Sequence, residues 1–372
     1  MPSGLPLNQT GGVGRPSRNP LRQGGVPFSR PRVRSKTMAN RDIVAIGTSA
    51  GGVEALLFLA TRFAPDFPAT VLITIHLPSE ARSSLDQILS RAGRLPATFA
   101  ACGETLRTGH IFIAPAGRHL LVDGNRIVLG SGPRENNARP AIDPMLRSAA
   151  VCCGPRTVGV VLTGTLGDGA SGLRAITQCG GISVVQDPDD AVFSEMPLMA
   201  LNRSMPHHVV HLAEIPGLLD RLVHQHTGEA ISCPESMNVE VQVAKGERAG
   251  MKDMDSIGRR SVLTCPQCNG VMWEIGEEGD FHYRCHVGHA YSAETMNLAL
   301  DENLRRALGS ALRALEERVA LTEKLRMQAS QRGYNRMTDL WTRKKAEVEE
   351  ETEVVRKAIL RAERIAAAFS ET

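Results

Sequence analysis

One serine in the glycine-rich segment IGTSAGG, residues 46–52, has the surroundings of a nucleophile. Ser49 stands in Gly-Thr-Ser-Ala-Gly, which fits the G-x-S-x-G elbow, where a sharp strand-to-helix turn presents the serine oxygen. The apolar run 43–47 precedes it and a helical pattern over 51–63 follows. A dinucleotide or P-loop phosphate site fits poorly, because serine replaces the second glycine and Val53-Glu54 supplies no Lys-Ser/Thr pair. We therefore interpret Ser49 as a nucleophile.

A serine nucleophile needs a base and a carboxylate that orients the base, and both should lie just past the ends of strands. His76 follows the apolar run 70–75, and Asp168 lies in a glycine-rich turn after the run 157–163. An aspartate at such a turn can also cap a helix, but the combination with Ser49 favours a catalytic triad. Rival bases that would restore the Ser-Asp-His order of the α/β-hydrolases are His207, His208 and His211.

Backbone N–H groups at the start of the helix after Ser49 would face a developing oxyanion. The candidates for oxyanion donors or for the tight turn are Thr48, Ala50 and Gly51, together with Thr165 in the loop that carries Asp168.

A second cluster has the spacing of a metal site. Cys265-x2-Cys268 is followed by Cys285-x3-His289, which is typical of a tetrahedral Cys3His zinc centre. His286 and His282 are alternative fourth ligands. About 30 residues cannot bury a sufficient core alone, so we expect the zinc to be structural. The remaining cysteines we interpret as small hydrophobic residues or inert thiols: Cys102, Cys152, Cys153, Cys179 and Cys233.

The elements that must position these groups follow from the hydrophobic pattern. Short apolar runs at 43–47, 70–75, 110–114, 126–130, 157–163, 182–186 and 208–211 alternate with helical patterns at 51–63, 81–92, 143–153, 169–179 and 213–226. Runs that are apolar throughout indicate strands covered on both faces. The sequence therefore predicts an α/β fold with a doubly wound, mostly parallel, Rossmann-like sheet, whose reactive groups lie beyond the carboxyl ends of the strands.

Five regions are expected along the chain: a disordered basic tail (1–41), the catalytic domain (42–228), a linker (229–260), a zinc-knuckle module (261–291) and a helical hairpin or coiled coil (292–372) broken near 331–335. The hairpin could also join two copies of the chain.

The charge distribution and the hydrophobic pattern argue against nucleic-acid binding, a membrane span and secretion. The formal charge is +3, but residues 1–37 hold seven basic residues and no acidic one, which leaves −4 for the rest. Nucleic-acid binding is therefore not favoured. We interpret the basic tail as inert, or as an artefact of a start at Met1 instead of Met38. No run reaches the roughly 18–20 apolar residues of a membrane helix, and no apolar signal segment follows the basic start. We expect a cytoplasmic protein.

At this point the sequence resembles the chemotaxis protein-glutamate methylesterases, the CheB catalytic domain family, over residues 42–228. The resemblance rests on IGTSAGG, ITIHLP, IFIAPAGRHL, RPAIDPMLRSAA, VVLTGTLGDGASGL and VVQDPDDAVFSEMPLMAL in this order. It implies a triad of Ser49, His76 and Asp168 that needs no catalytic cofactor. It also implies hydrolysis of glutamate γ-methyl esters on methyl-accepting chemoreceptors or related methylated signalling proteins, and deamidation of receptor glutamines by the same acyl chemistry.

The sequence departs from the family at two points. Thr165 and Leu166 stand where the family usually has Met and Gly, and only 41 residues precede the domain, where a receiver domain would need about 120. We expect a receiver-less variant whose zinc module and helices dock it on a receptor or partner, and whose intrinsic hydrolysis survives deletion of 261–372. The rival hypotheses are a same-triad esterase in another signalling pathway and a non-catalytic adaptor that acts through its tail.

Overall fold

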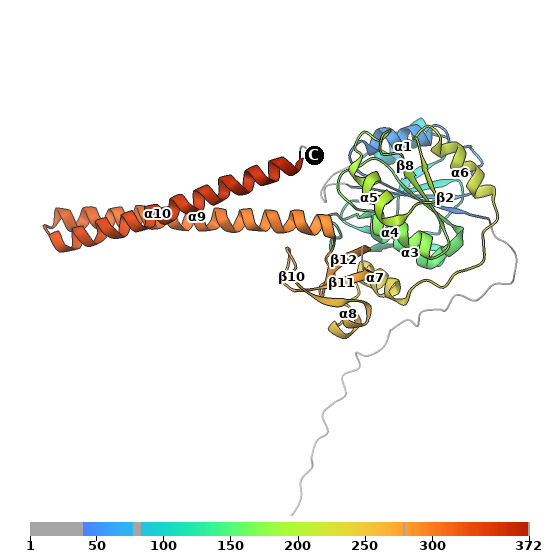
Figure 1. Ribbon diagram of the computed structural model, residues 1–372. Helices are drawn as coiled ribbons and strands as arrows, with labels where there is room; N and C mark the ends of the chain where they lie inside the picture. The colour runs from blue at the N-terminus through green and yellow to red at the C-terminus, as the bar shows by residue number, and fades with distance from the viewer. Residues whose placement is uncertain (1–39, 77–82, 278–279, 371–372) are drawn as a thin grey trace, which may run out of the picture. The chain divides into compact units, whose positions relative to one another are not determined.

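A seven-stranded parallel sheet forms the centre of the fold in this computed structural model, which describes residues 40–76, 83–277 and 280–370 of the chain (Figure 1). Every neighbouring pair of its strands is parallel. In spatial order the strands are β3 (Ala97–Phe99), β4 (His110–Ile113), β2 (Thr70–Ile75), β1 (Ile43–Thr48), β7 (Thr157–Val161), β8 (Ile182–Gln186) and β9 (His208–Val210).

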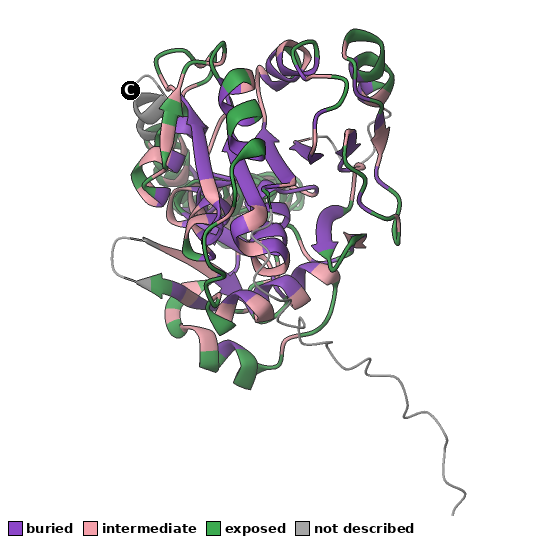
Figure 2. Cartoon of the chain, turned by 90° about the vertical axis from the view of Figure 1, so that its right-hand side faces the viewer, coloured by how far each residue is buried: buried purple, intermediate pink, exposed green. Residues whose placement is uncertain are grey.

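Helices cover both faces of this sheet, which is why its strands are apolar on successive residues. Val44 and Ile46 of β1 pack in one core cluster, whereas Ile43 and Ala45 pack in the other. The first cluster includes residues of α1 (Gly52–Ala60), α2 (Leu85–Ala92) and α6 (Ile215–His224). The second includes residues of α3 (Ile142–Cys153), α4 (Ala170–Gln178), α5 (Glu195–Ser204) and the hairpin of β5 (His119–Asp123) and β6 (Arg126–Gly130). Figure 2 shows the resulting buried interior of the sheet.

The strand order of the sheet reverses at β1, which is its topological switch point. The strands β2 and β4 extend the sheet on one side of β1, and β7, β8 and β9 extend it on the other. Parallel strands end at the same edge, so the loops after β1, β2 and β7 meet at this switch point, where open α/β sheets place their sites.

The predicted doubly wound α/β fold is confirmed, with local differences. The strands β3 and β5 and the helix α5 have no counterpart among the predicted elements. The run 126–130 forms β6, which pairs with β5 in a separate two-stranded sheet. The 3-10 turn Gly154–Arg156 connects α3 to β7.

The expected linker over 229–260 is wrong as a description of this region, because it contains α7 (Glu235–Lys245) and α8 (Met251–Ile257). The helix α7 packs against α3 and buries Met237, Glu240 and Val241. The polar sequence of α7 did not predict this packing, because Glu240 is buried through an ion pair with Arg284.

Cys179 and Cys233 form a disulfide, and their Cα atoms lie 4.9 Å apart. They are therefore not the separate thiols that the sequence suggested.

Four antiparallel strands follow, and we name them the C-terminal sheet: β10 (Arg259–Thr264), β11 (Val271–Glu277), β12 (Asp280–Cys285) and β13 (Ala290–Ser292). Two small clusters stabilise it. One contains Trp273 and Ile275 with Met254 of α8, and the other contains Met272 and Tyr291 with the first turns of the next helix.

The helices α9 (Ala293–Gln331) and α10 (Asn335–Ser370) form an antiparallel hairpin, which reverses at Gly333 (φ 72°) within the predicted break. Ion pairs of Arg356 with Glu316 and of Lys345 with Glu323 join the two helices. No helix in the described ranges is both long enough and apolar enough to cross a membrane.

The predicted tail over 1–41, including the alternative start at Met38, lies outside the described residues except for its last two positions. These two residues lie on the folded domain: Asn40 forms a β-bridge with His226, and Arg41 donates a hydrogen bond to the His226 carbonyl.

Candidate active site and metal site

Ser49 follows β1 directly, at the switch point of the sheet. Its amide donates to the Thr163 carbonyl beyond β7 (3.1 Å), and the chain then turns through Gly51, at φ 72°, into α1. Gly164 lies against the serine, because a Cβ added there would come 2.8 Å from the Ser49 Cβ. The strand-turn-helix context expected of a nucleophile elbow is therefore present.

His76, the residue after β2, contacts both predicted partners. Its Nδ1 lies 3.1 Å from Ser49 Oγ and its Nε2 lies 2.7 Å from Asp168 Oδ2. An ionised carboxylate only accepts hydrogen bonds, so Nε2–H donates to Asp168, and Nδ1 is left to accept the serine proton. The histidine side chain is 22% exposed, whereas the aspartate side chain is fully buried.

Asp168 is held as a carboxylate by four donors. Besides His76, the backbone N–H groups of Ile142 (2.6 Å) and Asp143 (3.2 Å) at the start of α3 donate to it, as does the Asn136 amide (3.0 Å). Burial by itself raises the pKa of Asp168, but the hydrogen bond and charge of His76, the Ile142 amide and Asn136 outweigh burial and lower it to about 2.

The oxyanion candidates have different surroundings. Thr48 is buried, and its hydroxyl donates to the Thr163 carbonyl (2.8 Å). The Ala50 carbonyl accepts from the Thr163 hydroxyl, so the turn between β1 and α1 is tied to the end of β7. Thr165 is half-buried beside Leu166, whose backbone has a φ of 65°. A left-handed φ favours glycine, which is a physical reason for the glycine usual at this position, and the leucine of this chain adopts that φ without it.

The rival bases lie at the edge of the sheet, beyond β7 and β8 from Ser49. The His207 ring lies 2.8 Å from the Ser183 hydroxyl, His208 is the first residue of β9, and the His211 ring contacts Asp190 at 3.3 Å. His76 is the histidine that reaches the serine.

Two polar residues of the site were not predicted from the sequence. Asn136 donates from its side chain to Asp168 and to Asp143 (2.9 Å), and Asp143 accepts the amides of Gly169 and Gly172. Asp143 lies in the RPAIDP motif, which is a sequence signal. Asn136 lies in a loop, where no spacing rule identifies it.

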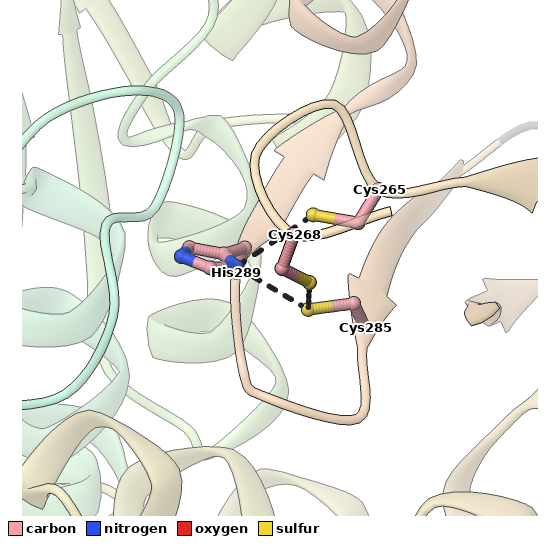
Figure 3. Close-up of side chains that lie close together, drawn as sticks. All are labelled: Cys265, Cys268, Cys285 and His289. Atoms are coloured by element: carbon pink, nitrogen blue, oxygen red, sulfur yellow. Dashed lines mark hydrogen bonds between the residues drawn. The ribbon is translucent and has the colours of Figure 1, made fainter. Parts of the chain in front are cut away.

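The C-terminal sheet brings Cys265, Cys268, Cys285 and His289 together, with their ligand atoms within 4.8 Å of one another (Figure 3). His289 Nδ1 lies 3.6 Å from Cys265 Sγ and 3.5 Å from Cys285 Sγ, and the Cys268 and Cys285 sulfurs are 3.7 Å apart. A tetrahedron with zinc–sulfur bonds of about 2.3 Å has sulfur–sulfur edges of about 3.8 Å. The four side chains therefore fit a zinc ion.

The other candidate ligands point elsewhere. His286 is exposed and its ring lies against Gly270. His282 Nε2 lies 2.7 Å from the buried Glu240 carboxylate, outside the group of four.

Comparison with known proteins finds one matching family and several similar proteins. Residues 44–219 match the family described as CheB methylesterase. The protein-glutamate methylesterase/protein-glutamine glutaminase 2 of Koribacter versatilis is 36% identical over 195 residues, which cover 51% of this chain and 53% of the relative. The protein-glutamate methylesterase/protein-glutamine glutaminase 1 of Paramagnetospirillum magneticum is 34% identical over 233 residues, which cover 56% of this chain and 61% of the relative.

A solved structure, the catalytic domain of the Thermotoga maritima CheB methylesterase, is 30% identical, covers 49% of this chain and 98% of that domain, and aligns with a TM-score of 0.47. The chain spans 53% of the length of the Koribacter versatilis relative and 61% of the length of the Paramagnetospirillum magneticum relative.

Proposed function

Through residues 44–219 this chain belongs to the CheB methylesterase family, and we propose that it hydrolyses glutamate γ-methyl esters on methylated chemoreceptors to glutamate and methanol. The observation that carries the proposal is the double contact of His76, whose two ring nitrogens lie within hydrogen-bond distance of Ser49 and Asp168.

In the first half of the proposed reaction, Ser49 Oγ attacks the ester carbonyl carbon while its proton passes to His76 Nδ1. The negative charge on the carbonyl oxygen is stabilised by backbone N–H groups of the turn, for which Ala50 and Gly51 are our candidates. Collapse of the intermediate breaks the bond to the methoxy group, which takes the proton from Nδ1 and leaves as methanol. Ser49 then holds the glutamyl group as an ester.

In the second half, water attacks the glutamyl-serine ester, His76 Nδ1 takes the proton of the water, and Ser49 leaves with that proton. Asp168 stays ionised throughout, consistent with its lowered pKa, and offsets the positive charge of the imidazolium. The same sequence on a glutamine side chain releases ammonia, so we propose receptor glutamine deamidation as a second reaction of this site.

We propose that zinc is held by Cys265, Cys268, Cys285 and His289 and stabilises the C-terminal sheet. A complete set of four protein ligands is typical of structural zinc, since catalytic zinc keeps an open position. Zinc content measured on the purified chain should be one per chain, and Cys268→Ser should lower it, whereas Cys102→Ser, at an exposed cysteine outside the group, should not.

Methanol release from a methylated receptor cytoplasmic fragment tests the main proposal. We expect release by the wild type, loss of release in Ser49→Ala, and wild-type release in Ser256→Ala, which removes an exposed hydroxyl on α8. Equal release by Ser49→Ala and the wild type would refute the proposed nucleophile. If methanol is not released but a phosphonofluoridate still labels Ser49, the esterase acts on another substrate.

A further inference from the structure

A side-chain amide connects the C-terminal sheet to the catalytic carboxylate. Asn136 lies in the loop between β6 and α3, and its Nδ2 donates to Asp168 Oδ1 (3.0 Å) and to Asp143 Oδ2 (2.9 Å). On the other side, its Oδ1 accepts the Ser292 amide of β13 (2.8 Å). The two amide hydrogens and the carbonyl oxygen of this side chain are therefore all engaged.

The backbone of the same residue is also bonded to β13. The Asn136 amide donates to the Ala290 carbonyl (2.8 Å), and Glu135 forms a parallel bridge with Ala290. Asn136 is only 6% exposed. The residue that orients Asp168 thus takes its position from β13, although 156 positions separate Asn136 from Ser292 in the sequence.

A buried ion network fixes the C-terminal sheet to this loop. Arg284 of β12 is fully buried and donates to Glu135 and Glu240, both at 2.9 Å, while Arg147 of α3 pairs with the same two carboxylates. Breaking one partner of a buried pair leaves an uncompensated charge, which is strongly unfavourable. The C-terminal sheet is therefore bonded to the catalytic domain by groups that cannot separate without a large cost.

The cysteine cluster lies next to β13 in the chain. His289 directly precedes Ala290, and its carbonyl accepts the Cys285 amide (2.9 Å). The turn that brings Cys285 and His289 together therefore ends where the bonds to Asn136 begin.

We propose that Asn136 is a positioning residue for Asp168 and that β13 of the C-terminal sheet holds it in place, so that the triad is complete only when this sheet is folded. The inference rests on the proposed function of the triad. Asparagine suits the position because it donates and accepts at once, and because it tolerates the left-handed φ of 49° found there.

The first test removes the amide. Asn136→Gly keeps the left-handed backbone accessible and deletes the side chain, and Asn137→Gly is the matched control, because Asn137 is exposed and also has a positive φ (63°). A hydrogen bond to a charged group is stronger than one between neutral groups, so we expect at least a tenfold fall in kcat and in the rate at which a phosphonofluoridate labels Ser49. KM should stay within about twofold, since no substrate contact is removed.

The second test removes the bond from the Ser292 amide to the Asn136 side chain. Ser292→Pro deletes the N–H that Asn136 accepts, and the φ of −62° at this position suits proline. Ser292→Ala is the control, because both variants lose the hydroxyl that caps α9 at Thr295, whereas Ser292→Ala keeps the N–H. Labelling of Ser49 should slow severalfold in Ser292→Pro and not in Ser292→Ala.

The combined variant decides whether the two changes act through one connection. If they do, Asn136→Gly with Ser292→Pro should label Ser49 about as slowly as Asn136→Gly alone. Thermal unfolding identifies any variant that has lost its fold. Wild-type labelling in folded Asn136→Gly, or multiplying effects in the combined variant, would overturn the proposal. Methanol release separates this result from failure of the proposed function, since labelling requires no receptor.

Discussion

At the scale of single residues, the central feature is a fully buried carboxylate that accepts from His76, two backbone amides and Asn136. Each donor stabilises the ionised form, so Asp168 can fix the histidine tautomer in which Nδ1 faces Ser49. The serine in turn has little space around it, because a Cβ added at Gly164 would come 2.8 Å from the Ser49 Cβ.

Replacement of Asp168 by Asn tests the tautomer argument. An amide in place of the carboxylate can donate to Nε2, which would move the ring proton to Nδ1 and remove the base from Ser49. We expect kcat to fall about 10⁴-fold with KM little changed, measured by methanol release on protein shown to be folded by circular dichroism. A fall of less than tenfold would contradict the assignment.

Replacement of Gly164 by Ala tests the packing around the nucleophile. The new Cβ would lie 2.8 Å from the Ser49 Cβ and 2.6 Å from the Met196 sulfur, so the serine or the loop must shift. Because a displacement of about 1 Å can cost about 10²-fold in rate, labelling of Ser49 should slow by one to two orders of magnitude. Gly228→Ala, where the added Cβ meets nothing within 4 Å, is the control and should label normally.

The sequence predicts Ser49 and His76 because each directly follows a buried strand, and Asp168 because it lies in the glycine-rich turn beyond a third, while parallel strands end at one edge of the sheet. Asn136 could not be predicted in this way. Its role depends on a loop that meets β13 across 156 positions, and no local pattern encodes that contact.

At the scale of elements, α7 and β12 meet through buried charge and not through apolar surface. Burial by itself would raise the pKa of Glu240, but Arg147, His282 and Arg284 hold it well below its usual value. The sequence did not predict α7 for the same reason. Its polar residues indicated a linker, although one of them, Glu240, is buried in the interior. The strands of the central sheet other than β3 were predictable, since their apolar runs need no distant partner to be recognised.

Glu240→Gln should show how pH acts on this network. The carboxylate has a lower pKa in the folded than in the unfolded state, so acid protonates the unfolded chain first and its stabilisation is lost as pH falls. At pH 7 we expect the variant to be less stable by about 3 kcal/mol. The difference from wild type should shrink below about pH 4.5, the usual pKa of glutamate.

Urea unfolding between pH 3.5 and pH 7 measures this difference. Glu235→Gln, at an exposed position in the first turn of α7, should follow the wild-type curve at every pH. A difference between wild type and Glu240→Gln that is constant over this range would contradict the ionised assignment.

At the scale of the whole molecule, the bonds between β13 and Asn136 change one expectation drawn from the sequence. A C-terminal extension that only docked on a partner could be deleted without effect on intrinsic hydrolysis. Here the extension supplies the backbone groups that bond Asn136, the residue we propose positions Asp168. We therefore no longer expect hydrolysis to survive deletion of residues 261–372.

Two truncations separate the sheet from the helical hairpin. Removal of residues 307–372 keeps β13 and the first turns of α9, including the Asn303 contact with Pro266, and should leave Ser49 labelling within about twofold of wild type. Removal of 261–372 should slow labelling at least tenfold, since Asp168 loses the support of Asn136. Equal labelling of the two truncations would show that the C-terminal sheet does not act on the triad.

The most direct measurement is the site of phosphonofluoridate attachment, determined by peptide mass mapping of the full chain and of Asp168→Asn. We expect one adduct per wild-type chain, located on Ser49, and far slower formation of the same adduct in Asp168→Asn. An adduct on another residue, no adduct in the wild type, or equal rates in the two proteins would contradict the triad on which the proposed methylesterase activity depends.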